Sequence, residues 1–148
     1  MSPQAASALA QPSQAVVLPA FDLNHVVERM KRLGNYKDWS DDQFATAILE
    51  YRRYVALCKL HPFEALVPGR QVDAVWHQHI LYDTQQYMVD CDNFLGRYLH
   101  HRSHSRVEAP GTGPSKGWQL TLRYYEQAFG TTPDQSWLKG QADCDCND

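Results

Sequence analysis

The sequence lacks the features that would assign it to a membrane or nucleic-acid-binding class. No stretch approaches about 18 consecutive apolar residues, the length that indicates a membrane-spanning helix. The 148-residue chain has a net charge of -3, whereas nucleic-acid binding normally needs a basic face. The weakly basic run from Arg97 to Arg106 is better explained as a solvated face. We therefore expect neither a membrane nor a nucleic acid as partner.

Export signals and zinc-finger cysteine spacings are also missing. Residues 1–19 are rich in Ala, Gln, Ser and Pro and lack the basic start and long apolar centre of a signal peptide, so we predict a disordered N-terminal segment. The four cysteines are then expected to be reduced and the protein cytoplasmic. Cys58, Cys91, Cys144 and Cys146 form no CxxC pair. Cys58 and Cys91 lie on apolar helical faces and are predicted to be small core residues.

Internal repeats and strand-like alternation are absent, and helical periodicity dominates. The pattern predicts an all-α fold, a single compact bundle of about five helices within residues 20–138, followed by a flexible, acidic, solvated tail at 139–148. Ser40 begins a capping box, Ser-Asp-Asp-Gln, and so begins a helix that ends before Pro62. Further helices are expected at about 23–33, 71–82 and 118–129, with a short helical turn at 133–138.

The residues after position 82 leave two alternatives open. Asp83 and Thr84 either continue the preceding helix or cap a separate one that runs to Leu95, with Gly96 as its terminator. Apolar residues on both sides of the 71–82 helix predict that it is central and surrounded by other helices.

Four of the seven histidines lie between residues 77 and 101, in apolar and aromatic surroundings. Asp73 and His77 have the i, i+4 spacing at which two side chains of one helix can chelate an ion. His77 and His79 point about 160° apart on a helix and cannot share one ion. One conceivable site therefore uses Asp73, His77 and Thr84. The other uses His79, either as a packed core histidine or as a ligand on the opposite face.

The adjacent histidines at 100 and 101 diverge by about 100° on a helix or 180° on a strand, so only one of them should face the core. A histidine from this segment would complete a His/His/Asp set, which is typical of zinc or non-haem iron sites. We predict His77, His101 and Asp73 as metal ligands, with His79 and His100 as second choices. Asp73 could instead hydrogen-bond a histidine and fix its tautomer.

The leading interpretation is an intracellular helical protein that binds zinc or iron. An open coordination position would permit hydrolysis or oxygen chemistry on a small-molecule or peptidic substrate. The alternative is a metal-free interaction module for a peptide or protein partner, with the histidines as a hydrogen-bonded core. A third interpretation is a pH-responsive structural staple. Cys144-Asp-Cys146 could bind a soft metal, although a solvated tail is the preferred interpretation.

The segment from Val72 to Thr84, followed by Tyr87 and then by Gly96 to His101, resembles the VDxxWHxH…T…Y…G…HH core of the glycine-rich domain-containing protein-like family. The likeness extends over about 44–138, and it supplies no reaction. The chain lacks the glycine-rich extension of that family and has Arg102-Ser103 where relatives continue HH-x-P, so a role tied to the extension is not expected. The resemblance implies these shared motif positions: Asp73, Trp76, His77, His79, Thr84, Tyr87 and His101.

Overall fold

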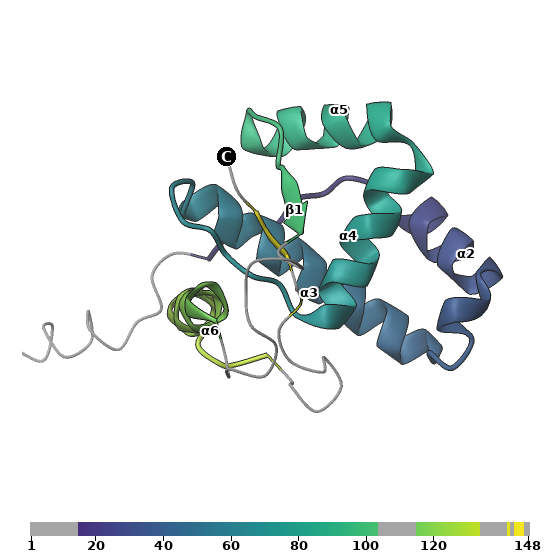
Figure 1. Ribbon diagram of the computed structural model, residues 1–148, viewed down its shortest axis with the longest axis horizontal. Helices are drawn as coiled ribbons and strands as arrows, with labels where there is room; N and C mark the ends of the chain where they lie inside the picture. Colours follow the sequence, from purple (N-terminus) through teal and green to yellow (C-terminus); the bar gives the residue numbers. More distant parts are fainter. Residues whose placement is uncertain (1–14, 104–114, 134–141, 143, 147–148) are drawn as a thin grey trace, which may run out of the picture.

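The computed structural model describes residues 15–103, 115–133, 142 and 144–146. It confirms the all-α bundle that the sequence predicts (Figure 1). Two short strands, which the sequence pattern did not predict, accompany the helices. In chain order the elements are α2 (Asn24–Arg32), a 3-10 turn η1 (Gly34–Tyr36), α3 (Asp41–Leu60), α4 (Arg70–Tyr82), α5 (Thr84–Leu95), β1 (His101–Ser103), α6 (Lys116–Phe129) and β2 (Cys144–Cys146).

Side-chain caps define where the helices begin. The Ser40 hydroxyl accepts the backbone N–H of Gln43, and the Gln43 side chain accepts the N–H of Ser40, which is the predicted capping box of α3. Asp83 has an extended backbone, and its carboxylate accepts the N–H groups of Gln85 and Gln86 at the start of α5. Asp83 therefore separates α4 from α5, and the second of the two alternatives is correct.

Helix α4 is the central element, in contact with α2, α3 and α5. Figure 1 shows it crossing the middle of the molecule beneath α5. Val75 and Trp76 of α4 are almost completely buried, and the Trp76 ring packs at 5.4 Å from the ring of Tyr54 on α3. A helix that is apolar on more than one side must be covered on more than one side. The position of α4 is therefore strongly fixed by packing.

The connector at 61–69 lies between α6 and β2. Its Val67 N–H donates to Thr121 Oγ1 of α6 at 3.0 Å. Its Leu66 carbonyl accepts the Cys146 N–H of β2 at 3.0 Å. The connector is thus attached both to α6 and to the late strand β2.

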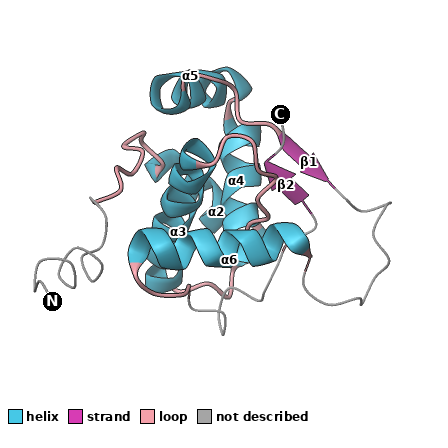
Figure 2. Ribbon diagram, turned by 90° about the vertical axis from the view of Figure 1, so that its left-hand side faces the viewer, coloured by secondary structure: helices cyan, strands magenta, loops and turns pink. Residues whose placement is uncertain are grey.

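Strands β1 and β2 form an antiparallel pair beside α4 (Figure 2). His101 pairs with Cys146, and Ser103 pairs with Cys144. Cys144 is 2% exposed and Cys146 is 5% exposed. The prediction of a solvated tail is therefore wrong for these two residues. Both cysteines are buried because residues two apart in a strand share one face, and here this face is the buried one.

Several sequence predictions concern residues outside the described ranges. These are the lead segment up to residue 14, the end of the basic run at 104–106, the helical turn beyond Pro133, and the tail at 139–141, 143 and 147–148. The described part of the lead segment, residues 15–19, has no helix or strand, and the Pro19 carbonyl accepts a bond from the Arg52 guanidinium at 2.8 Å. The division of the chain at residues 19 and 138 stays a prediction.

Tyr87 joins α4, α5 and the segment that leads into β1. Its hydroxyl accepts the indole N–H of Trp76 at 2.8 Å and donates to the Leu99 carbonyl at 2.6 Å. The ring of His101, two residues beyond Leu99, packs against Trp76 with ring centres 4.5 Å apart. The Tyr87 hydroxyl thus positions the start of β1, and with it His101, against α4.

We predict that Tyr87→Phe lowers the free energy of unfolding by about 2–3 kcal/mol, because the indole N–H and the Leu99 carbonyl both lose a buried partner. Urea denaturation followed by circular dichroism measures this loss. Tyr82→Phe, at a side chain on the surface of α4, is the matched control and should change stability by less than about 0.5 kcal/mol. Equal losses in the two variants would contradict this role for the Tyr87 hydroxyl.

Candidate metal centre

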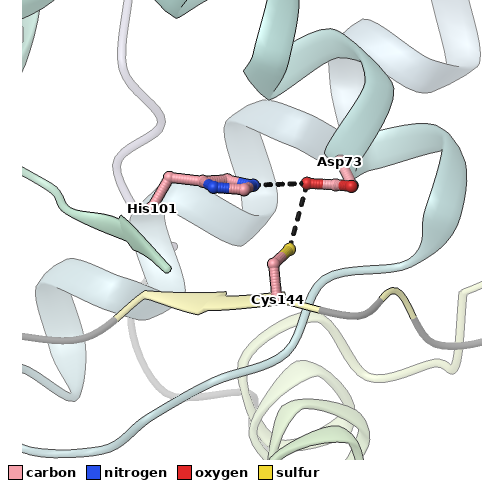
Figure 3. Close-up of side chains that lie close together, drawn as sticks. All are labelled: Asp73, His101 and Cys144. Atoms are coloured by element: carbon pink, nitrogen blue, oxygen red, sulfur yellow. Dashed lines mark hydrogen bonds and ion pairs between the residues drawn. The ribbon is translucent and has the colours of Figure 1, made fainter. Parts of the chain in front are cut away.

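Four side chains of types that can ligate a metal meet at the face of α4 that carries the strand pair. Asp73 and His77 come from α4, one helical turn apart, His101 comes from β1, and Cys144 comes from β2. Figure 3 shows His101 and Cys144 approaching the carboxylate of Asp73 from two different strands. The predicted combination of Asp73, His77 and His101 is therefore brought together, with a thiol in addition.

The Asp73 Oδ1 atom is the centre of this group. It lies 2.8 Å from His101 Nε2, 3.0 Å from Cys144 Sγ and 3.3 Å from His77 Nε2. The ligand atoms of Asp73, His101 and Cys144 all lie within 4.8 Å of one another, and this group could hold a metal ion. Ligands of tetrahedral zinc lie roughly 3.2–3.8 Å from each other, given bonds of about 2.0–2.3 Å. Outward shifts of a few tenths of an ångström would therefore make room for an ion.

The Nε2 atoms of the two histidines face each other and can share one N–H···N hydrogen bond. His77 Nε2 and His101 Nε2 are 2.9 Å apart, and an imidazole nitrogen either donates a proton or offers a lone pair. Only one proton fits between the two nitrogens, so two N–H groups there would oppose each other. A cation would accept a lone pair from each nitrogen and from the Asp73 carboxylate, and no shared proton would then be needed.

Two opposing effects set the charge of Asp73. Burial acts to raise the pKa of its carboxyl, but hydrogen bonds from His101 and Cys144 and the charge of His77 outweigh burial and lower this pKa below its ordinary value. Asp73 is therefore an anion at neutral pH, as a metal ligand must be. The side chain of His77 is 46% exposed, against 15% for His101. Solvent thus reaches the group from the side of His77.

His79 belongs to a separate, buried network. Its Nδ1 accepts the Tyr51 hydroxyl at 2.7 Å, and its Nε2–H donates to Asp90 Oδ2 at 2.7 Å, with the proton assigned from these two partners. Gln86 donates to the other oxygen of Asp90 at 2.9 Å. Burial lowers the pKa of His79 more than the hydrogen bond to Asp90 raises it. A neutral His79 satisfies every one of these bonds. Of the two roles that the sequence left open for His79, the structure therefore supports the packed core histidine.

The other predicted positions lie outside the group. His100 is exposed, and its ring packs on Tyr98 at 4.7 Å, so only His101 of the adjacent pair turns inward, as expected. Thr84 is an exposed first residue of α5. It does not share a face with Asp73 because the helix does not run through Asp83. Cys58 and Cys91 are buried, as predicted.

Sequence reasoning did not find Cys144 as a candidate ligand of this group. The acidic neighbours of Cys144 indicated a solvated tail, and nothing in the pattern connects it with Asp73, which lies 71 positions earlier. The available signal was the Cys-x-Cys spacing, which places two thiols on one face of an extended segment.

A family model described as UCP032817-like matches residues 13–134. The chain belongs to the UCP032817-like family. The matched part of this UCP032817-like protein includes all the helices named above and three members of the group, Asp73, His77 and His101. No curated protein and no solved structure matches the chain. Within the described ranges, none of the helices has the length and apolar character that crossing a bilayer demands.

We predict that the stability of the metal-free protein falls as the pH drops below about 6.5, the ordinary histidine pKa. The pKa of His79 is lower in the folded state than in the unfolded state. The unfolded chain therefore binds the extra proton first, and the contribution of His79 is complete above pH 6.5 and lost toward its folded pKa. Urea denaturation with a chelator at several pH values, with an NMR titration of the His79 ring, tests this. A His79 midpoint above 6.5 would contradict the assignment.

Proposed function

We propose that this protein binds one divalent metal ion through Asp73, His101 and Cys144, with His77 as a fourth ligand. The observation that carries the proposal is the convergence of two imidazole nitrogens, a carboxylate oxygen and a sulfur from three elements of the fold. Zinc is the ion that this set suits best, because thiolate, imidazole and carboxylate are all normal ligands of tetrahedral zinc. Non-haem iron is second, since the usual iron triad of two histidines and a carboxylate contains no thiolate.

We propose a structural role for the ion. Strands β1 and β2 are three residues each, and a two-stranded pair is marginal even at greater length. An ion held by α4, β1 and β2 would cross-link these elements and add its binding free energy to folding. Hydrolysis or oxygen chemistry on a small or peptidic substrate would need an open position. The exposed His77 is the ligand that water could replace.

One sequence argument supports this proposal. The motif likeness to the glycine-rich domain-containing protein-like family involves Asp73, His77 and His101, which are three of the four proposed ligands. We also propose a cytoplasmic location, since a reducing compartment maintains a thiolate ligand in reduced form. The competing proposal is a metal-free module for a peptide partner. It requires the protein to fold with these four side chains bound only to one another and not to a metal.

Metal content separates these two proposals. Tag-free protein prepared under reducing conditions should contain about one equivalent of zinc or iron by elemental analysis. His101→Ala should remove the ion, because it deletes one of the proposed ligands. His100→Ala, the adjacent exposed histidine, should retain it and is the matched control. Wild-type protein that is folded by circular dichroism but free of metal, even after incubation with zinc, would contradict the proposal.

Zinc should also stabilise the chelator-treated protein. At a free zinc concentration of 100 times Kd, the free energy of unfolding should rise by about 2.7 kcal/mol. Asp73→Asn has nearly the same shape but lacks the anionic ligand, so its gain should be much smaller. Thermal melts of both proteins with and without zinc measure the difference. An equal gain in the two proteins would place the ion elsewhere.

A further inference from the structure

Cys58 of α3 and Cys146 of β2 bring their sulfur atoms to 3.1 Å, outside the group just described. Both thiols are buried. A disulfide bond is about 2.05 Å long, so the sulfurs need to approach by only about 1 Å. We propose that Cys58 and Cys146 are an oxidisable dithiol, and that their disulfide fixes β2 and thereby regulates the metal centre. The regulatory part rests on the proposed function, whereas formation of the disulfide does not.

The surroundings of the two thiols hold them in this position. Cys58 lies on the 20-residue helix α3 and is completely buried. The backbone of Cys146 is held by the carbonyl of Leu66, and Cys146 pairs with His101 across the strands. Cys144, two residues away, directs its sulfur to Asp73 instead, at 3.0 Å. The two thiols of the Cys-x-Cys segment thus have different partners, one in the metal group and one in the dithiol.

The oxidant that fits this pair is a small disulfide such as oxidised glutathione. The Cys146 sulfur attacks one sulfur of the reagent, forms a mixed disulfide and releases one glutathione thiol, which takes the proton of the Cys146 thiol. The Cys58 sulfur then attacks Cys146 Sγ, releases the second glutathione thiol and passes its proton to it. Two protein thiols and one disulfide reagent give one protein disulfide and two thiols. Cys146 reacts first because a strand of three residues opens more readily than a 20-residue helix, in whose last turn Cys58 is completely buried.

The disulfide would act on the metal centre through β2. Once Cys146 is bonded to α3, Cys144 is held opposite Asp73 and no longer has to be ordered when an ion binds. Preorganised ligands bind more tightly because less ordering remains to be done. In the reduced protein, β2 is held only by its hydrogen bonds and by side-chain packing. Zinc affinity should therefore be higher in the oxidised protein, by roughly 3- to 10-fold.

Oxidation of chelator-treated protein tests the dithiol without involving metal. Incubation of the native full chain with oxidised glutathione should yield the Cys58–Cys146 cross-linked peptide on digestion and mass spectrometry. The melting temperature should rise by roughly 10 °C and return with dithiothreitol, because the bond closes a long loop. Cys91→Ser, at another buried cysteine, should behave as wild type. Cys58→Ala, checked for folding by circular dichroism, should show no rise.

Folded wild-type protein that gives no Cys58–Cys146 peptide, or only glutathione adducts, would overturn the dithiol. A cross-link that leaves the melting temperature unchanged would overturn the claim that the disulfide fixes β2. Zinc titration of the oxidised and reduced wild-type proteins then tests regulation: equal affinities overturn the regulatory part. A cross-link without zinc binding in either state contradicts the metal proposal and the regulation, while leaving the dithiol intact. Zinc binding without a cross-link contradicts the dithiol and the regulation, while leaving the metal proposal intact.

Discussion

The hydrogen bonds that the Asp73 carboxylate accepts from His101 and Cys144 join parts of the chain that are otherwise weakly connected. Helix α4 is fixed by burial on several sides, whereas β1 and β2 are too short to be stable as an isolated pair. The stability of the two strands therefore depends on their contacts with the rest of the chain. Asp73 supplies an anion on a rigid helix, and the strands bring a nitrogen and a sulfur to it. A metal ion would turn this set of hydrogen bonds into a set of stronger bonds.

Two histidines of one helix, only two residues apart, have opposite roles in this account. His79 points into the core, where Tyr51 donates to it and Asp90 accepts from it, so its hydrogen bonds are complete when it is neutral. His77 points toward His101, where a second imidazole nitrogen, the Asp73 carboxylate and the Cys144 thiol come together. The convergence of several ligand atoms, more than the number of histidines, separates a candidate ligand from a structural histidine.

Local features of the fold could be predicted from the sequence, because helix caps and helical spacing depend on neighbours in the chain. The Ser40 cap, the central position of α4 and the shared face of Asp73 and His77 are of this kind. The contact of Cys144 with Asp73 could not be predicted in this way, because it depends on how α4 and β2 pack against each other. A three-residue strand carries too little alternation to be recognised, and the acidic residues around Cys144 indicated the opposite environment.

The central claim is that an ion is held by nitrogen, oxygen and sulfur at Asp73, and X-ray absorption at the zinc edge tests it most directly. Zinc-loaded protein should show one sulfur at about 2.3 Å and nitrogen or oxygen neighbours at about 2.0–2.1 Å, four ligands in all. The sulfur signal should disappear in Cys144→Ser. A spectrum with only nitrogen and oxygen neighbours in the wild-type protein, or one that Cys144→Ser leaves unchanged, would contradict the account.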